Sequence, residues 1–299
     1  MLLSILIPTY NLSCYKLVYD LQQQLISSGV EYEIIVADDG SRDQVSVIAN
    51  LKINELDGCR YLRRTENVGR AAIRNVLARE AKGEWLIFID NDAKVERPDY
   101  IARYIATALE NKGNAMVFPG GLYHADSCPS PLVTLRYRYE KEADCHRRAD
   151  ERNLDPYSRF TTFNVMIHRD VMKHVMFDEQ CHEYGHEDTL FGQQLKAAGI
   201  KVMHIDNPLQ HVGLESNEIF LKKTVTAIKS LIAIKGKLEG MSQLEVTAEK
   251  ICRWHIAWFV RILFHLAKPI MMKNLRGTNP SLFVFKIFKL GTYLDLLKA

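Results

Sequence analysis

The sequence lacks the short motifs that define several other classes of protein. No Gly-x-Gly-x-x-Gly follows the first predicted strand, which argues against a dinucleotide-binding Rossmann unit. No Gly-x-x-x-x-Gly-Lys-Ser/Thr occurs either, which excludes a P-loop nucleoside triphosphatase. The six cysteines include no Cys-x-x-Cys pair and no metal-ligand spacing, a pattern typical of free thiols in a reducing compartment. The segment MLLSILIPTYN lacks the basic start and the cleavage site of a secretory signal, so we expect a cytoplasmic protein.

The overall charge of +3 hides two regions of opposite sign. Residues 214–299 contain 14 Lys/Arg and six Asp/Glu, whereas the first 213 residues contain 25 basic and 30 acidic side chains. With 47% hydrophobic and 25% charged residues, the chain is long enough to bury one large core and to add an appendage. We therefore predict two domains, residues 1–213 and 214–299, and expect no nucleic-acid partner.

Predicted strands and helices alternate along the acidic region. Apolar runs predict strands at residues 3–8, 32–37, 60–63 and 85–90, and helical periodicity predicts helices at 15–28, 41–51, 69–81 and 98–111. Ser41 suits the N-cap of the second helix. Alternation at this spacing predicts an α/β fold with a mostly parallel sheet and helices on both faces.

The segment WLIFIDND at residues 85–92 ends an apolar run with two carboxylates, Asp90 and Asp92. Because ligands bind at the carboxyl ends of the strands in a parallel sheet, both side chains are expected where a ligand reaches them. Their charges repel unless a cation lies between them, and a hard divalent cation shared with a phosphate meets that need. A solvated acidic turn is the alternative interpretation of this motif taken alone.

The first two predicted strands end in further candidate ligand contacts. The first leads into Pro8-Thr9-Tyr10-Asn11, and the second leads into Asp38-Asp39-Gly40. Taken singly, Tyr10 is a packing residue and the aspartates form a turn. Together with the acidic pair, they place an aromatic ring, a carboxylate that accepts a base N–H and a metal-binding pair along one rim of the sheet. This combination favours a nucleotide site.

Two series of motifs follow one another in the sequence. The first contains PTYN, DDGS, ENVGRAAIRN and FIDND, and the second contains TTFNVMIHRDVM, MFDE and GHEDTLFGQQLKAAG. Over residues 3–211 the chain resembles a family 2 glycosyltransferase with the GT-A fold, a Rossmann-like class of inverting, nucleotide-sugar-dependent enzymes. The resemblance implies a nucleotide-binding half at about residues 1–118 and an acceptor half at about 119–213.

The resemblance implies a role for each residue that matches a family motif. Asp188, at the start of a predicted helix at 188–198, would be the catalytic base. Asp92, Asp90 and His211 would bind Mn or Mg, and Asn164, Glu187 and His186 would lie on the acceptor side. The donor nucleotide would contact Pro8, Thr9, Tyr10, Asn11, Asp38, Asp39, Asn67, Gly69, Arg70, Arg74 and Asp90. The chain departs from the family pattern at Ala93, where a second acid often follows.

Some of these implied roles have plain structural alternatives. Glu187 and Asp188 also suit a helix N-terminus, where negative charges are favourable. His211 lies near a glycine-containing turn, where a histidine is as often a structural residue as a metal ligand. The sequence leaves both alternatives open.

The implied activity is that of a metal-dependent hexosyltransferase of the EC 2.4 class. It would move a sugar from a nucleotide-sugar donor, a UDP-sugar by family frequency, to a glycan or lipid-linked acceptor in surface polysaccharide synthesis. A divalent ion stabilises the leaving diphosphate, and one base suffices for a single displacement that inverts the anomeric centre. A sugar-nucleotide pyrophosphorylase is an alternative, but PTYNLSCYK lacks the Gly-rich loop of that class. An inactive GT-A binding module is another, although every expected acid is present.

Residues 214–299 are predicted to form a basic, apolar helical region. The first long run is interrupted by Arg253, Arg261 and Lys268 and broken by Pro269, which makes it a poor membrane-spanning helix. Aromatic side chains beside basic ones suit a membrane interface. The residues expected in the acyl boundary are Trp254, Trp258, Phe259, Phe264 and Leu266. We therefore expect peripheral association with the inner face of the membrane, with packing on the catalytic domain or in a homodimer as the alternative.

Overall fold

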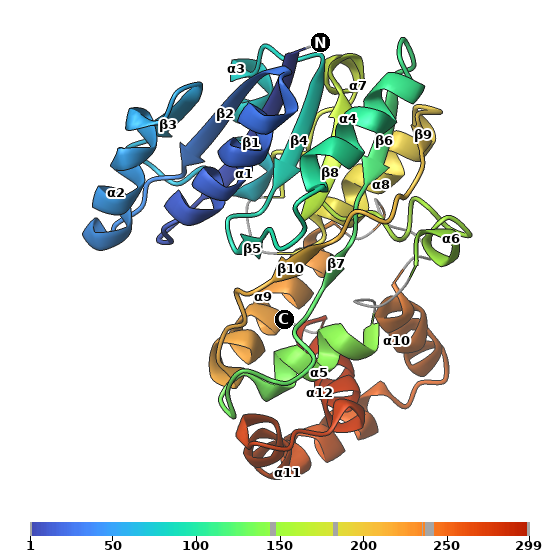
Figure 1. Ribbon diagram of the computed structural model, residues 1–299. Coiled ribbons are helices and arrows are strands. Elements are labelled where there is room, and N and C mark those ends of the chain that lie inside the picture. Colours follow the sequence, from blue (N-terminus) through green and yellow to red (C-terminus); the bar gives the residue numbers. More distant parts are fainter. Residues whose placement is uncertain (1, 144–147, 182–184, 235, 237–241, 298–299) are drawn as a thin grey trace. The chain divides into compact units, whose positions relative to one another are not determined.

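The computed structural model describes residues 2–143, 148–181, 185–234, 236 and 242–297 of the chain (Figure 1). The chain divides into two compact units. Unit 1 comprises Met1–Tyr123, His146–His182 and Glu187–Gly213, and unit 2 comprises His124–Cys145, Glu183–His186 and Leu214–Ala299. The functional division of the chain at residue 213 stays a prediction.

Unit 1 is built on a seven-stranded sheet in the order β3-β2-β1-β4-β8-β6-β9. Four strands run parallel, namely β1 (Leu2–Thr9), β2 (Glu31–Asp38), β3 (Cys59–Arg63) and β4 (Trp85–Ile89). The strand β8 (Asn164–His168) lies antiparallel between β4 and β6 (Met116–Pro119), and β9 (Lys201–Val202) pairs parallel with β6. The predicted mostly parallel α/β sheet is confirmed.

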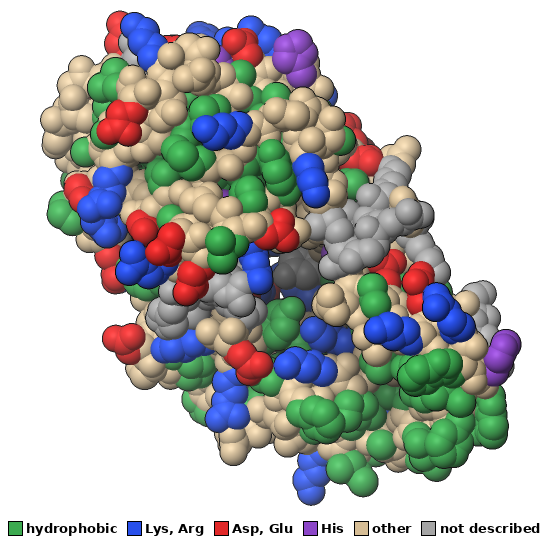
Figure 2. Space-filling view, turned by 90° about the vertical axis from the view of Figure 1, so that its right-hand side faces the viewer, with side chains coloured by type: hydrophobic (Ala, Val, Ile, Leu, Met, Phe, Trp, Pro, Cys, Tyr) green, Lys and Arg blue, Asp and Glu red, His purple; other side chains and the backbone are tan. Residues whose placement is uncertain are grey.

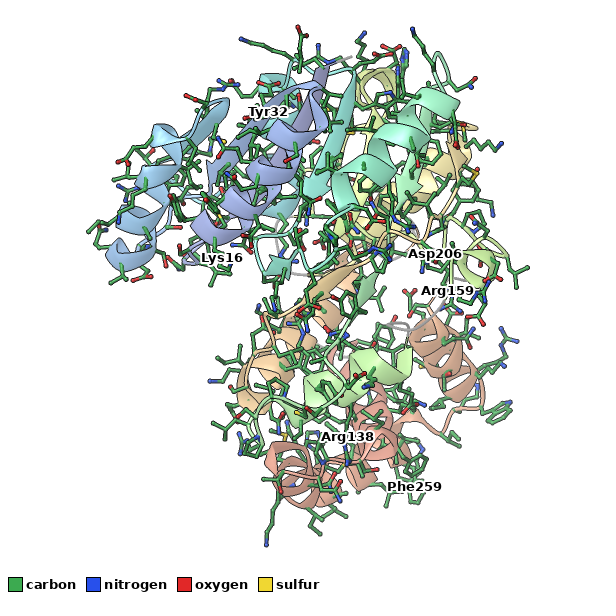
Figure 3. The ribbon with its side chains drawn as sticks, viewed as in Figure 1. Lys16, Tyr32, Arg138, Arg159, Asp206 and Phe259 are labelled. Carbon is green, nitrogen blue, oxygen red and sulfur yellow. The ribbon has the colours of Figure 1, made fainter. Side chains whose placement is uncertain are left out.

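The helices of unit 1 connect these strands (Figure 1). They are α1 (Tyr15–Ser28), α2 (Gln44–Leu51), α3 (Arg70–Glu80), α4 (Tyr100–Glu110), α6 (Ala149–Arg152), α7 (Arg169–His174) and α8 (Glu187–Ala197). The side chain of Asp206 anchors α6 by accepting the Ala149 N–H at 2.8 Å (Figure 3). The predicted N-cap at Ser41 is wrong. Asp43 caps α2 by accepting the Ser46 N–H at 3.1 Å, whereas the Ser41 hydroxyl accepts the Asn11 N–H at 2.7 Å.

The core of unit 1 lies against the parallel strands, where both faces of the sheet are covered. Ile5, Ile34 and Ile87 occupy three neighbouring strands in register, and all three are completely buried. Because both faces are buried, these strands read as continuous apolar runs in the sequence. The rigid strands therefore fix the positions of the loops that follow them.

A small second sheet holds the C-terminal segment of unit 1. Its strands β5 (Ala93–Lys94), β10 (Leu209–His211) and β7 (Leu122–Tyr123) occur in the order β5-β10-β7. The strand β10 pairs antiparallel with β5, so that His211 lies opposite Ala93. This pairing brings a histidine from the far end of unit 1 beside the acidic loop that follows β4.

Unit 2 is helical, with α5 (Thr134–Ala143), α9 (Asn217–Ala233), α10 (Gln243–Arg253), α11 (Ala257–Arg276) and α12 (Leu282–Leu296). Its apolar core comprises Leu135, Phe220, Leu221, Phe264, Met271, Leu275, Phe285 and Phe288. A guanidinium N–H of Arg138 donates to the carbonyl of Pro280 at 2.9 Å and ties α5 to the segment before α12 (Figure 3). None of the helices in the described ranges is both long and apolar enough to cross a bilayer.

Two expectations for this region are wrong. Pro269 does not break the helix, because α11 continues through it to Arg276. An interior proline costs about 3 kcal/mol, and the burial of Phe264, Met271 and Leu275 on either side offsets that cost. Phe264 is therefore unavailable to lipid. Its ring packs so closely on Gly291 of α12 that a Cβ there would overlap it.

Candidate active site

The acidic loop after β4 is fastened to the end of β1. The side-chain amide of Asn91 donates a hydrogen bond of 2.8 Å to the Thr9 hydroxyl, which itself donates to the Leu12 carbonyl at 2.9 Å. Because Asn91 is held, the carboxylates on either side of it, Asp90 and Asp92, point from a fixed loop.

Asp92 and His211 form one cluster on this loop. The Asp92 Oδ2 and His211 Nε2 atoms are 3.2 Å apart, and the Val212 N–H donates to the Asp92 carbonyl at 3.0 Å. The His211 ring is buried and packs edge-on against Phe163. A Cβ at Gly213 would collide with the Asp92 carboxylate, so the chain passes this point only as glycine.

Asp90 and Glu187 are linked by a buried arginine. The Arg74 guanidinium, with 2% of its side chain exposed, lies 2.6 Å from Asp90 Oδ1 and 3.7 Å from Glu187 Oε1. Arg70, one turn earlier on α3, approaches the same glutamate oxygen at 3.5 Å. Burial raises the pKa of Glu187, but Arg70 and Arg74 together outweigh it, so its pKa lies below the usual value. Glu187 therefore remains ionised as the partner of both arginines.

Asp188 lies at the start of α8 and is held by two consecutive threonines. Its Oδ1 accepts the Thr162 hydroxyl at 2.6 Å, and its Oδ2 accepts the Thr161 hydroxyl and the Thr162 N–H, each at 3.2 Å. Burial, and next the charge of Glu187, raise the pKa of Asp188 to about 6, although Arg74 opposes the shift. Neighbouring carboxylates thus differ in pKa, with Glu187 fixed as an anion and Asp188 able to exchange a proton near neutrality.

The two aspartates after β2 have separate partners. Asp38 is completely buried and accepts the Ser41 N–H at 2.7 Å and the Tyr61 hydroxyl. Asp39 accepts the N–H groups of Val68 and Gly69 at 2.8 and 2.9 Å. Burial raises the pKa of Asp39, while these two N–H groups lower it. Asp38 shapes the turn, and Asp39 holds the loop before α3.

The remaining donor-side candidates surround these aspartates. Tyr10 and Asn67 are exposed, Pro8 is half-buried, and Gly69 takes a backbone φ of 90° that favours glycine. The Asn11 side-chain oxygen accepts the Arg42 and Asp43 N–H groups at 2.7 and 3.0 Å. Asn67 and Gly69 also line a cavity of about 560 Å³ in unit 1.

One acceptor-side prediction does not fit the geometry. Asn164 is completely buried, and its amide accepts two tyrosine hydroxyls (Tyr100 and Tyr104, at 2.7 and 2.9 Å) and donates to two backbone carbonyls. It is therefore a structural residue of β8. His186 belongs to unit 2 and has a left-handed φ of 68°, and its acceptor-side role stays a prediction. The sequence interpretation also missed Thr161 and Thr162, although both lie in the TTFN motif.

The mostly parallel sheet with carboxylates in the loops after its strands is the arrangement expected of a GT-A glycosyltransferase, and comparison with known proteins agrees. The family profile of glycosyl transferase family 2 matches residues 4–176. The chain belongs to this family.

Among curated proteins, chondroitin synthase of Pasteurella multocida is 26% identical over 242 residues. The alignment covers 70% of this chain, which spans only about a quarter (24%) of the synthase. The poly(ribitol-phosphate) β-N-acetylglucosaminyltransferase TarS of Staphylococcus aureus (strain Mu50) is 32% identical over 103 residues, covering 31% of this chain and 17% of TarS.

Two solved structures share the fold at low sequence identity. S. aureus TarS 1–349 in complex with UDP-GlcNAc superposes with a TM-score of 0.51 at 17% identity, covering 100% of this chain and 91% of that one. The mannosyltransferase PcManGT of Pyrobaculum calidifontis, in complex with GDP-Man and Mn²⁺, gives a TM-score of 0.54 at 13% identity, covering 98% and 84%.

Proposed function

We propose that this protein is an inverting glycosyltransferase that transfers a sugar from a UDP-sugar to a glycan or lipid-linked acceptor in surface polysaccharide synthesis. The observation that carries the proposal is the pairing, within unit 1, of a carboxylate–imidazole cluster at Asp92 and His211 with a partly buried carboxylate of raised pKa at Asp188. The names of the relatives, a chondroitin synthase and a poly(ribitol-phosphate) glycosyltransferase, support the polymer-building role.

The Asp92–His211 cluster fits a divalent cation such as Mn²⁺ or Mg²⁺. Adjacent ligands of an octahedral ion with bonds of about 2.1 Å lie about 3 Å apart, and the oxygen and nitrogen in question are 3.2 Å apart. When bound there, such an ion would supply the charge that stabilises the departing diphosphate. Asp90 was also predicted as a ligand, but its Oδ1 is paired with Arg74. We therefore assign Asp90 the role of ordering the loop that presents Asp92.

Asp188 is the residue suited to take the proton of the acceptor hydroxyl. A carboxylate offers about four lone-pair positions, and Thr161 and Thr162 fill three of them. The threonines orient the group, and its pKa of about 6 matches a base that works near neutrality. Attack by the activated hydroxyl and departure of the nucleotide on the opposite face would invert the anomeric centre in a single displacement.

On the donor side we assign the nucleobase contact to Tyr10 and Asp39. Tyr10 is exposed at the end of β1, where a ring can stack on a base, and Asp39 follows the adjacent strand β2. Both aspartates are buried, but Asp38 is completely so, whereas Asp39 keeps 4% of its surface exposed. For unit 2 we retain the proposal of peripheral contact with a membrane, which would bring a lipid-linked acceptor to the enzyme.

A panel of nucleotide sugars tests the donor assignment. The melting temperature of the protein is measured with each nucleotide sugar in the presence and absence of Mn²⁺. A ligand at 100 times its Kd stabilises the fold by about 2.7 kcal/mol, so UDP-sugars are expected to raise the melting temperature only when Mn²⁺ is present. A larger rise with GDP-sugars would contradict the UDP assignment, and UDP release from the stabilising donor would exclude an inactive binding module.

The pKa of Asp188 predicts a pH profile. Because the base must be ionised, kcat/KM should fall about tenfold per pH unit below an apparent pKa near 6 and level off above it. The profile is measured as UDP release between about pH 5 and 8, with the melting temperature recorded at each pH to confirm folding. A flat profile over this range would show that Asp188 is not the proton acceptor.

A further inference from the structure

Helix α11 is apolar on two opposite faces. Phe264, Met271 and Leu275 lie on the face buried in the core of unit 2. The opposite face carries six apolar side chains, each between 49% and 75% exposed, which we call the α11 ridge: Trp258, Phe259, Ile262, Leu263, Leu266 and Ile270. At about 100° per residue these positions fall within one sector of the helix. A contiguous exposed surface of this kind marks an interaction site.

Hydrophobic side chains are exposed at the surface of unit 2. Figure 2 shows hydrophobic side chains gathered over the lower part of the molecule, with Lys and Arg side chains between them. Phe259 projects outward from α11 (Figure 3). Trp254, just before α11, and Phe283 of α12 are also exposed.

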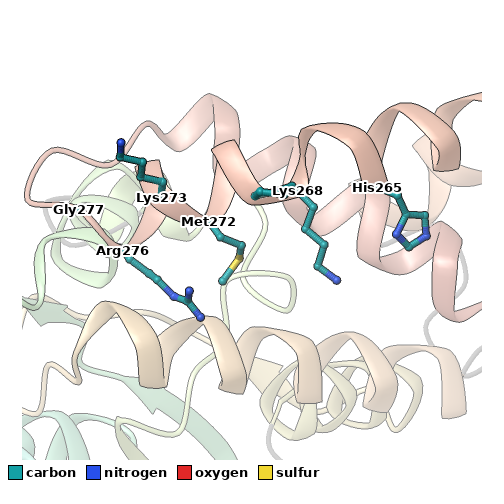
Figure 4. A pocket seen from close by; sticks show the side chains of 7 residues that line it. His265, Lys268, Met272, Lys273, Arg276 and Gly277 are labelled. Carbon is teal, nitrogen blue, oxygen red and sulfur yellow. The ribbon is translucent and has the colours of Figure 1, made fainter.

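Lys273 falls in the same sector of the helix as the ridge, whereas Lys268 lies toward the buried face, and α11 contains no Asp or Glu. Lys268, Lys273 and Arg276 line a cavity of about 700 Å³ together with His265 and Met272 (Figure 4). Lys268 points to the same side of the helix as Met272 and Arg276, whereas Lys273 points away from them (Figure 4).

Two of these basic groups have an acidic partner within unit 2, and two do not. Arg276 pairs with Glu218 of α9 at 2.5 Å, and His265 lies 3.0 Å from Asp295 of α12. Lys268 and Lys273 form no ion pair with any carboxylate in the part of the chain that the structure describes. Lys268 instead lies over the ring of Phe264. Lys273 is therefore the ammonium group on the side of the ridge that is available to an external anion.

We propose that the α11 ridge lies in the interface of a bilayer containing anionic phospholipids, with Lys273 at the level of the lipid phosphates. The proposal rests on the peripheral membrane contact proposed above and assigns its surface and lipid chemistry. Tryptophan and phenylalanine beside lysine suit the boundary between headgroups and acyl chains. A second copy of the chain is a poorer occupant, because a two-fold contact would bring the Lys273 side chains of both copies together.

Vesicle co-sedimentation of the full-length protein tests the proposal. Vesicles of phosphatidylcholine alone are compared with vesicles that also contain phosphatidylglycerol, at low and high salt. We expect binding to the phosphatidylglycerol vesicles that weakens in high salt, and little binding to phosphatidylcholine. The fluorescence of the exposed Trp254 and Trp258 should shift to shorter wavelength on binding, whereas Trp85 is already buried.

Two variants of α11 separate the apolar and the ionic contributions. Lys273→Gln should weaken binding to anionic vesicles about fivefold, the contribution of one basic residue, whereas Lys268→Gln, on the other side of the helix, should leave it unchanged. Leu266→Gln with Ile270→Gln should abolish sedimentation and the fluorescence shift. The matched controls are Lys112→Gln with Lys201→Gln and Val45→Gln, which change exposed residues of unit 1 and should bind as the wild type does.

Three results would overturn the proposal. They are equal binding to both kinds of vesicle, wild-type binding by both Lys273→Gln and the ridge variant, and a dimer in sedimentation velocity that the ridge variant converts to monomer without any vesicle binding. The stabilisation of each variant by UDP-sugar and Mn²⁺ is measured in parallel. A variant that loses vesicle binding but still binds the donor would show an effect on α11 alone. A wild-type protein that does not bind the donor would count against the proposed enzyme activity and not against the membrane proposal.

Discussion

Replacing Asp188 with asparagine is expected to lower UDP-sugar turnover by a factor on the order of 100 or more while leaving donor affinity intact. Asparagine keeps the shape of the side chain, and its oxygen can still accept the Thr162 hydroxyl. It has no basic oxygen to take a proton near pH 6. Turnover is measured as UDP release with Mn²⁺, and donor affinity by titration calorimetry.

The matched control for this variant is Asp170→Asn. Asp170 occupies the first turn of α7 and is half-exposed, so it carries the same favourable charge at a helix N-terminus but lies on another helix. A similar loss of activity in both variants would favour the helix-terminus interpretation of Asp188. Loss of donor affinity together with activity in Asp188→Asn would make Asp188 a binding or structural residue.

The second large effect is expected at Asp92. In Asp92→Ala the carboxylate partner of His211 is lost, so Mn²⁺-dependent donor binding and turnover should fall together, by on the order of 100-fold or more. Treating the wild type with EDTA should reproduce the variant, and added Mn²⁺ should restore the wild type but not the variant. Donor affinity is measured by calorimetry, and folding by the melting temperature.

Glu110→Ala provides the control, because Glu110 is an exposed acid at the end of α4. This change should alter neither metal dependence nor turnover. Full activity of the wild type in EDTA would refute the metal assignment. Full activity of Asp92→Ala would show that the Asp92 carboxylate is not needed to bind the metal.

Arg74 shows how one residue can change its interpretation once the fold is known. In the sequence it lies in the ENVGRAAIRN motif and is read as a donor contact. In the structure its guanidinium is buried between Asp90 and Glu187. Because an unpaired buried charge is costly, Arg74 requires both acids and fixes their positions. It also opposes the rise in the pKa of Asp188.

Local rules failed where distant parts of the chain supplied the decisive contacts. Ser41 suits an N-cap, but its hydroxyl is used by Asn11 and the helix begins later, at Gln44. Pro269 normally ends a helix, but packing of the buried residues around it carries α11 onward. Asn164 looked available to an acceptor, but two tyrosines from α4 saturate its amide oxygen.

The sequence by itself determined the strands of the parallel sheet and the residues at their ends. Apolar runs and helical periodicity are local properties, and loops that follow parallel strands meet at one edge whatever the rest of the chain does. This is why Thr9, Asp39, Asp90 and Asp92 could be named in advance.

Only the tertiary structure decided how these groups pair and how acidic they are. Asp92 meets His211 across 119 positions of sequence because β10 pairs with β5. Asp188 gains its raised pKa from burial and from Glu187, and the exposed α11 ridge exists because the opposite face of the helix fills the core of unit 2. Burial and long-range contact depend on the whole fold, so no local pattern in the sequence contains them.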